Sequence, residues 1–130
     1  MTMLTNAMVI PTLPAIDLKR AKKFFDEKLG LKVVMEDPSP GVMLQCGKGT
    51  MLYIYQRAQS KADHTLASFV VDDIEAEVKE LKRKGVKFEE YDIPSIGLKT
   101  VNSIATIGKE KSAWFKDSEG NILAVMQMLK

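Results

Sequence analysis

The side chains that most often carry chemistry are scarce in this sequence. Among its 130 residues there is one histidine, His64, and one cysteine, Cys46. A neutral imidazole accepts a proton near physiological pH, so His64 is a candidate general base. However, Asp63 is expected on the opposite face and no other acid or base is placed beside it, so an exposed histidine at a strand start is the competing interpretation. Cys46 would be reactive only if a positive charge lowered its pKa, and Lys48 is the one local candidate, so we expect an ordinary buried or edge-strand thiol.

The spacing of other residues does not support two further kinds of site. No serine, histidine and acid cluster can be assembled from motifs. The segment Gly47–Gly49 lies in a predicted turn between strands, whereas a phosphate-binding loop follows a strand and opens a helix. Nucleotide chemistry therefore has no support in the sequence.

Length and composition indicate one well-packed domain. The chain is 45% hydrophobic and 28% charged, with a formal net charge of +2. Acidic and basic residues are interleaved, as along residues 75–84, which is typical of a solvated helix face, so nucleic acid is not an expected partner. No apolar run is long enough to span a membrane, and a single cysteine excludes an intrachain disulfide. We therefore expect a cytoplasmic protein with no membrane contact.

An internal repeat predicts the elements that position these side chains. Strand-like runs end at Asp17 and Asp72, and a glycine, Gly30 or Gly85, follows thirteen residues after each. Between them apolar residues recur at a spacing close to 3.6, which predicts a helix with one buried face. Each aspartate suits the N-cap, Asp72 and Glu75 resemble a capping box, and each glycine suits the left-handed position that ends a helix.

Three further strands follow each helix, so each half is predicted to run strand, helix, strand, strand, strand. The halves differ mainly by extra residues within 92–111 of the second half. The predicted strands cover residues 9–16, 31–35, 42–46 and 50–55 in the first half, and residues 66–71, 87–91, 112–115 and 121–128 in the second.

Three motifs stand out in this layout: AIDLKRAKKFF at 15–25, VVDDIEA at 70–76 and WFKDSEGNI at 114–122. With their order and spacing, the chain resembles the glyoxalase/bleomycin-resistance/dioxygenase superfamily, although Ser118 stands where the family's turn commonly has proline. The resemblance implies an α+β fold in one domain, 1–130, of two tandem βαβββ modules at about 8–58 and 62–128. Their open, curled mixed sheet is expected to surround a central cleft.

Metal-dependent members of that family place one ligand on each of four strands that line the cleft. The resemblance puts these positions at Ile10, Tyr53, Leu66 and Ala124, none of which supplies an imidazole or a carboxylate for a divalent metal. His64 shares the predicted face of Leu66 but lies two residues away along the strand. We therefore expect no metal and no other cofactor, and a divalent metal in a shifted register or an unusual site stays the alternative.

The remaining lining of the cleft follows from the alternation of side chains along strands. A few hydroxyl groups among apolar side chains suit an organic ligand that is held by burial and oriented by hydrogen bonds. The competing interpretation is that the aliphatic residues fill the cleft as core, whereas tyrosines favour a wet or ligand-bearing surface. The predicted ligand-binding residues are Thr12, Met51, Tyr53, Tyr55, His64, Leu66, Ser68, Ala124 and Met126.

Two features of the second half bear on this cleft. Trp114 could pack beneath the helices or face the cleft, and we expect it in the core. The long connection within 92–108 carries aliphatic residues among Gly, Pro and Ser, and long connections are often functional. We hypothesise that it folds over the cleft as a lid, with Ile96, Leu98 or Ile104 facing the ligand.

The expected function is binding of a small, largely apolar organic molecule without a metal, as in the drug-binding branch of the resembling family. The alternative is an enzyme, either a glyoxalase-type lyase or a dioxygenase-like oxidoreductase, with an unconventional site that uses His64. A third possibility is a regulatory subunit whose cleft is filled by its own side chains. The resemblance also implies a homodimer.

Overall fold

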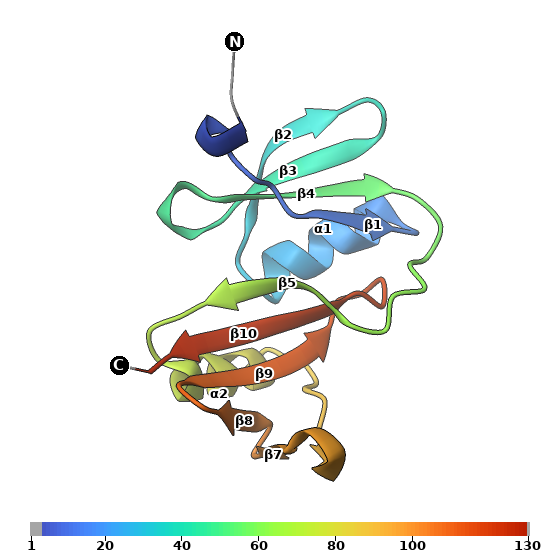
Figure 1. Cartoon of the computed structure of the whole chain (residues 1–130). Coiled ribbons are helices and arrows are strands. Elements are labelled where there is room, and N and C mark those ends of the chain that lie inside the picture. Colours follow the sequence, from blue (N-terminus) through green and yellow to red (C-terminus); the bar gives the residue numbers. More distant parts are fainter. Residues whose placement is uncertain (1–3, 130) are drawn as a thin grey trace.

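The first half of the chain forms a four-stranded mixed sheet with one helix against one face (Figure 1). The computed structural model describes residues 4–129. Strand β1 pairs in parallel with β4, and the other pairings are antiparallel, which gives the strand order β1-β4-β3-β2. The elements of this module are β1 (Thr12–Ala15), α1 (Leu18–Glu27), β2 (Lys32–Asp37), β3 (Gly41–Gln45) and β4 (Met51–Gln56), with short 3-10 helices η1 (Leu4–Asn6) and η2 (Gly47–Gly49).

The second half repeats this plan with a wider sheet. Strand β5 pairs in parallel with β10, and the strand order is β5-β10-β9-β8-β7-β6. Both sheets are mixed and open, so the predicted α+β class with two modules is confirmed. The elements are β5 (Thr65–Val70), α2 (Ile74–Arg83), β6 (Asp92–Ile93), η3 (Pro94–Ile96), β7 (Leu98–Val101), β8 (Ile104–Ile107), β9 (Glu110–Lys116) and β10 (Ile122–Met128).

The outer edge of the second sheet differs from the prediction. Residues 87–91 were expected to form a strand, yet they contribute one isolated bridge, between Phe88 and Phe115. The extra residues supply β7 and β8 instead, and β8 pairs along β9 from Ala105 to Ile107. The prediction of a strand at 87–91 is therefore wrong, because the inserted hairpin occupies the side of β9 that this strand would have used.

The helix ends follow the predicted capping chemistry with one shift. The side chain of Asp17 accepts a hydrogen bond from the Arg20 amide and caps α1 as predicted. At α2 the cap is Asp73, whose carboxylate accepts from the Ala76 amide, so the prediction of Asp72 and its capping box is wrong by one residue. The helix starts at Ile74, so Asp73 is the residue directly before it and occupies the N-cap, and Asp72 lies one residue outside the cap. Gly85 follows the last helical turn with φ +93°, as the left-handed position requires.

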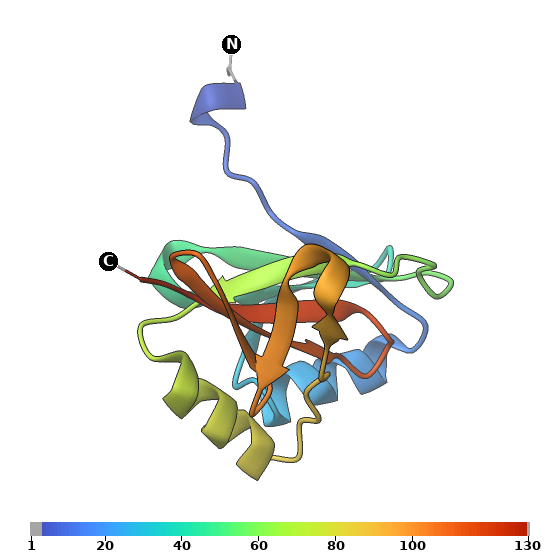
Figure 2. The same cartoon turned by 60° about the horizontal axis from the view of Figure 1, so that its bottom comes forward.

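Helices α1 and α2 cover the same side of both sheets, and the opposite side is open (Figure 2). The apolar faces of both helices and both sheets meet in one continuous core. Phe25 of α1 and Ile74 of α2 are fully buried in it, as are Leu13 of β1 and Leu123 of β10. The side of the two sheets that faces away from the helices is called the open face below.

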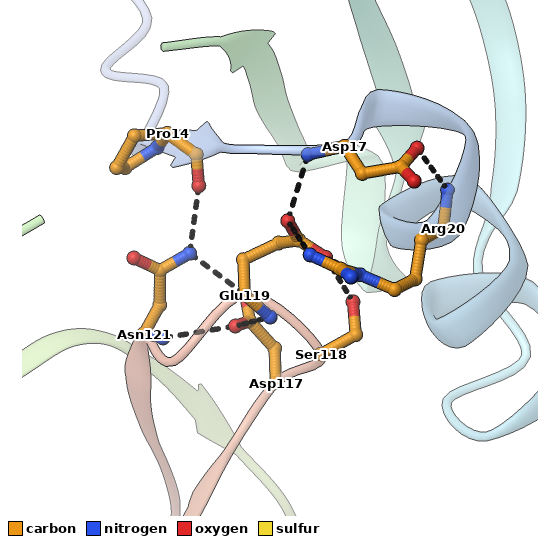
Figure 3. A network of polar contacts seen from close by, with 7 residues as sticks. All are labelled: Pro14, Asp17, Arg20, Asp117, Ser118, Glu119 and Asn121. Atoms are coloured by element: carbon orange, nitrogen blue, oxygen red, sulfur yellow. Dashed lines mark hydrogen bonds and ion pairs between the residues drawn. The ribbon is translucent and has the colours of Figure 1, made fainter. Parts of the chain in front are cut away.

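A polar junction joins the two modules where the turn between β9 and β10 reaches the start of α1 (Figure 3). Glu119 lies in this turn, and its side chain is 1% exposed. Its carboxylate accepts two hydrogen bonds from the Arg20 guanidinium, at 2.8 and 3.0 Å, and one from the Asp17 amide at 2.9 Å. Burial alone would raise the pKa of Glu119, but the hydrogen bonds from Arg20, the Asp17 amide and Ser118 outweigh it and lower this pKa to about 2. Glu119 therefore carries a negative charge and links the second module to the first through these hydrogen bonds.

A second part of the junction is built on Asn121, which is buried. Its side-chain amide donates to the Pro14 carbonyl of β1 at 2.9 Å and to the Asp117 carboxylate at 2.8 Å (Figure 3). Burial raises the pKa of Asp117, against the hydrogen bonds that Asn121 and the Glu119 amide donate to it. The two modules are thus held together by the shared core and by this polar junction.

Candidate functional site

The open face of the first sheet carries four of the predicted ligand-binding residues. Leu13, Leu52 and Ile54 point into the core from β1 and β4. Side chains alternate along a strand, so the residues between and beside them point to the open face. These open-face residues are Thr12, Met51, Tyr53 and Tyr55, of which Thr12 is exposed and the other three are half-buried.

The open face of the second sheet is set by the same alternation. Leu123 and Val125 of β10 point into the core, so Ala124 and Met126 point to the open face. Ser68 of β5 pairs with Ala124 and therefore shares this face. The two sheets thus present Ala124, Met126 and Ser68 on the same side of the molecule as the tyrosines of β4.

Trp114 lies on the open face and not in the core. It pairs with Ala124 across β9 and β10, and its indole N–H donates to the Thr65 hydroxyl of β5 at 3.1 Å. Because β10 separates β9 from β5, the indole crosses β10 beside Ala124, which is consequently buried. The ring of Tyr91 meets the indole edge-on, with ring centroids 5.4 Å apart. The expectation of a core position for Trp114 is therefore wrong, since its cross-strand partner faces away from the helices.

Leu66 is displaced by an irregularity in β5. Thr65 pairs with Ile122 and Ala67 pairs with the next residue, Leu123, so Leu66 is an extra residue at a β-bulge. Its side chain is half-buried and packs against the core. The predicted alternation, which put Leu66 beside Ser68 on the cleft face, does not hold at this point because the bulge interrupts it.

His64 precedes β5 and is exposed. Its side chain is 70% exposed, and its Nδ1 atom lies 3.7 Å from the carboxylate of Asp63. Asp63 was expected on the opposite face, but in this irregular segment the two side chains are neighbours. A general base needs a reactant within hydrogen-bond reach and gains from a site that excludes water. The surroundings of His64 give it no feature of that kind.

Tyr53 makes a contact that sequence reasoning missed. Its hydroxyl lies over Gly41 of β3 and 3.3 Å from the Asp37 carboxylate of β2. The ring of Tyr55 lies nearly parallel to it, at an angle of 21° and a centroid separation of 6.2 Å. The guanidinium of Arg57 lies 5.8 Å from the centre of the Tyr55 ring. The two tyrosines thus form a flat aromatic surface with a carboxylate at one end, and no local pattern in the sequence pointed to Gly41 or Asp37.

A groove of about 380 Å³ runs along the seam where the first sheet meets β5. Cys46 lies in the wall of this groove and is half-buried. Burial raises the pKa of its thiol, which is typical of a structural cysteine rather than a reactive one. We call this feature the seam groove. Its lining is mostly apolar and consists of Val9, Pro11, Cys46, Gly47, Thr50, Met51, Leu52, Ala67, Ser68, Phe69 and Val70. A smaller cavity of about 130 Å³ lies on the helix side, among core residues such as Leu81 and Phe115, and is a packing gap.

The segment expected to form a lid is part of the second sheet. Residues 92–107 form β6, η3, β7 and β8, which extend the sheet beyond β9. Ile104 packs against the core, Leu98 is half-buried, and Ile96 is exposed in η3. Ile104 therefore does not point to the open face, because the hairpin pairing turns it toward the helices.

The residues at the four family ligand positions do not fit a metal. Ile10 and Leu66 carry no donor atom, and Ala124 is buried beside the indole that crosses β10. Tyr53 is the one position with an oxygen, and its hydroxyl is engaged with Asp37. Within residues 4–129 no cluster of three or more His, Cys, Asp or Glu side chains could hold a metal ion.

Comparison with known proteins agrees with this architecture. The family model of the glyoxalase/bleomycin resistance protein/dioxygenase superfamily matches residues 7–125. The chain belongs to this superfamily. A search of curated proteins gave no match. Within the described part of the chain, no helix is long and apolar enough to cross a membrane.

Solved structures of the superfamily share the fold at low sequence identity. An antibiotic-binding protein from a Streptomyces species is 20% identical, with a TM-score of 0.67 over 94% of this chain and 97% of its own. A manganese-bound fosfomycin resistance protein from Listeria monocytogenes is 15% identical, with a TM-score of 0.64 over 92% and 87%. A lactoylglutathione lyase from Agrobacterium tumefaciens is 24% identical, with a TM-score of 0.64 over 93% and 92%. At these identities the likeness shows the fold alone, and this one fold serves both binding proteins and enzymes.

Proposed function

We propose that this protein binds a small, largely apolar organic molecule on its open face, without a bound metal. One observation carries the proposal. The four family ligand positions hold residues that do not suit a metal, and the same face of the sheets carries aromatic rings and hydroxyl groups. Tyr53, Tyr55 and Trp114 offer flat rings, and Thr12 and Ser68 offer hydroxyls near them. Such a surface holds an organic ligand by burial and orients it by a few polar contacts.

The antibiotic-binding member of the superfamily supports this class of ligand for the present chain. The fosfomycin resistance protein and the lyase support the alternative, an enzyme of the lyase or dioxygenase type. The surroundings of His64 weigh against this alternative, because its side chain is mostly exposed and its charged neighbour, Asp63, is fully exposed. We therefore favour binding over turnover.

We further propose that the functional unit is a homodimer. Ligand pockets bury most of the surface of a drug-sized molecule. In one copy, however, the helices cover one side of the sheets and leave the other side uncovered (Figure 2). The aromatic surface lies on this uncovered side, because Tyr53 and Tyr55 alternate with the core residues of β4. A second copy laid against the open face would supply the missing wall.

Intrinsic fluorescence gives a direct test, because Trp114 is the only tryptophan and its indole lies on the open face. We would titrate the protein with 8-anilinonaphthalene-1-sulfonate, an aromatic probe whose rings are apolar and which carries one sulfonate, and follow tryptophan quenching before and after dialysis against EDTA. Saturable quenching that EDTA leaves unchanged supports the proposal. Native mass spectrometry of the same preparation would show any co-purified organic molecule. Stoichiometric bound metal whose removal abolishes the response would favour the enzyme alternative, and an absence of saturable binding would contradict the proposal.

A further inference from the structure

Two charged side chains flank the aromatic surface that Tyr53 and Tyr55 form on the open face. The carboxylate of Asp37 lies at the Tyr53 hydroxyl, and the guanidinium of Arg57 lies over the Tyr55 ring. Among residues 4–129 neither Asp37 nor Arg57 forms a salt bridge. A molecule that lies on these rings therefore meets a charge that no protein group has neutralised.

The carboxylate of Asp37 is held in place beside the rings. Asp37 is the last residue of β2, and its side chain accepts a hydrogen bond from the Ser39 amide at 3.0 Å. This contact is of the Asx-turn type, in which an aspartate side chain binds the backbone two residues on. The Tyr53 hydroxyl donates a second hydrogen bond to Asp37, at 3.3 Å. The negative charge is thus fixed relative to the aromatic surface.

The groups at this end of the aromatic surface can still accept hydrogen bonds but have no proton left to donate. A carboxylate has about four lone-pair sites, and the amide and hydroxyl of Ser39 together with the Tyr53 hydroxyl use at most three of those on Asp37. The one proton of the Tyr53 hydroxyl is engaged with Asp37, so only its lone pairs are left for a ligand. A ligand group that reaches this end must therefore donate hydrogen bonds.

The aromatic rings favour a positive charge as well. The face of a tyrosine ring attracts cations, and Arg57 already makes such a contact, 5.8 Å from the centre of the Tyr55 ring. Arg57 competes with a cationic ligand for the Tyr55 ring, which leaves the Tyr53 ring and Asp37 as the favoured place for the ligand's charge. A donor that is also a cation satisfies the carboxylate and the ring together.

We propose that the ligand of the open face carries a protonated amine on an aromatic or aliphatic body. The ammonium group donates to Asp37 and to the Tyr53 hydroxyl, and the apolar body lies on the rings of Tyr53 and Tyr55. The inference rests on the proposed function, because it names the class of ligand for the same surface. A neutral molecule of the same shape leaves the charge of Asp37 without a partner and binds less tightly.

Two naphthalene probes of the same shape test the need for a charge. The amine, 2-naphthylmethylamine, is protonated at neutral pH, whereas 2-naphthylmethanol has the same ring system and a neutral hydroxyl group. Calorimetric titration at low ionic strength leaves an exposed charge least screened. Under these conditions the amine should bind about fivefold more tightly than the alcohol. Equal affinities, or tighter binding of the alcohol, would overturn the inference.

Substitutions assign this preference to Asp37. Asp37→Asn keeps the shape of the side chain but removes its charge, so the affinity for the amine should fall about fivefold, to that of the alcohol. Arg57→Gln removes the competing cation and should raise the affinity for the amine about twofold. Glu36→Gln is the matched control, because it removes the same charge from the adjacent residue, which pairs with Lys22 of α1 instead. An affinity for the amine that Asp37→Asn leaves unchanged, or that Glu36→Gln lowers equally, would contradict the proposal.

Probes without the amine separate this inference from the proposed function. The alcohol and 8-anilinonaphthalene-1-sulfonate both read binding to the aromatic surface, and Asp37→Asn should not weaken either, since it removes no attraction for them. Saturable binding of these probes without a preference for the amine would reject the cationic ligand alone. An absence of saturable binding for all three probes would reject the proposed function, and this inference with it.

Discussion

The hydroxyl of Tyr53 lies so close to the Cα of Gly41 that a Cβ atom at position 41 would approach it to 2.0 Å. Glycine is therefore what allows the tyrosine to lie across β3 and to donate a hydrogen bond to Asp37 of β2 at 3.3 Å. Hydrogen bonds from the Ser39 amide and hydroxyl, and also from Tyr53, lower the pKa of Asp37, so this carboxylate is charged at neutral pH. The position of the aromatic surface is thus set by a residue without a side chain.

Gly41→Ala should weaken ligand binding without unfolding the protein. The added methyl group meets the far end of a side chain that can rotate away, so we expect the free energy of unfolding to change by less than about 1 kcal/mol. The displaced ring loses its place beside Asp37, and we expect affinity for the fluorescent probe to fall about tenfold. Urea unfolding and probe titration measure the two effects. Gly41→Ala in a Tyr53→Ala background is the control, because the three nearest heavy atoms to a Cβ at position 41 all belong to Tyr53. A further loss of affinity in that background would show that Tyr53 is not the cause.

Leu66→Ala should destabilise the protein and leave probe affinity nearly unchanged, in contrast to Gly41→Ala. Leu66 packs against the core from the β-bulge, so its truncation should lower the free energy of unfolding by about 2 kcal/mol. Probe affinity should stay within about twofold of wild type, because the side chain does not line the open face. Ser68→Ala, on the open face of the same strand, is the comparison and should leave stability nearly unchanged. Lost affinity in Leu66→Ala under conditions where it remains folded would place Leu66 in the ligand site after all.

Glu119→Gln should loosen the junction between the modules. The substitution keeps the shape of the side chain but removes the charge that Arg20 and the Asp17 amide stabilise. Breaking a buried ion pair from one side costs several kcal/mol, and we expect about 2 kcal/mol here because Arg20 is itself partly exposed and regains water. Thermal and urea unfolding report the loss. Glu80→Gln removes an exposed pair with Arg83 within one helix and should have no measurable effect.

Acid should remove this contribution of Glu119 within a defined pH range. The folded pKa of Glu119 is about 2, below its ordinary value of 4.5. The unfolded chain therefore binds the proton more readily, so the stabilisation is fully present above about pH 4.5 and is lost as the pH falls toward 2. Asp117 acts in the opposite direction, because burial raises its pKa and protonation relieves the cost of its buried charge. We therefore compare wild type with Glu119→Gln, because both proteins retain Asp117 and its effect cancels in the comparison. The difference between their free energies of unfolding should be constant from pH 7 to 5 and should shrink toward pH 3. A difference independent of pH would exclude the charge of Glu119 as its source.

Much of the fold was predictable because its signals are local. The helix between Asp17 and Gly30 is encoded by apolar spacing, an N-cap carboxylate and a terminal glycine, all within fourteen residues, and the repeat of this pattern after Asp72 predicted two modules. The one-residue error at the second cap, Asp73, reflects two adjacent aspartates that local chemistry does not distinguish. The identity of a residue shows whether its side chain carries a donor atom, but the assignment of Leu66 to the cleft depended on a register that the bulge in β5 changes.

Tertiary structure decided what depends on pairing between distant segments. The bulge that withdraws Leu66 from the open face arises from the register of β5 against β10, and the same pairing brings Thr65 within reach of the Trp114 indole. Glu119 and Arg20 are 99 residues apart in the chain, and no spacing rule joins them. Alternation along a strand determines which residues share a face, but the register and curl of neighbouring strands determine which of them meet, and these follow from packing of the whole core.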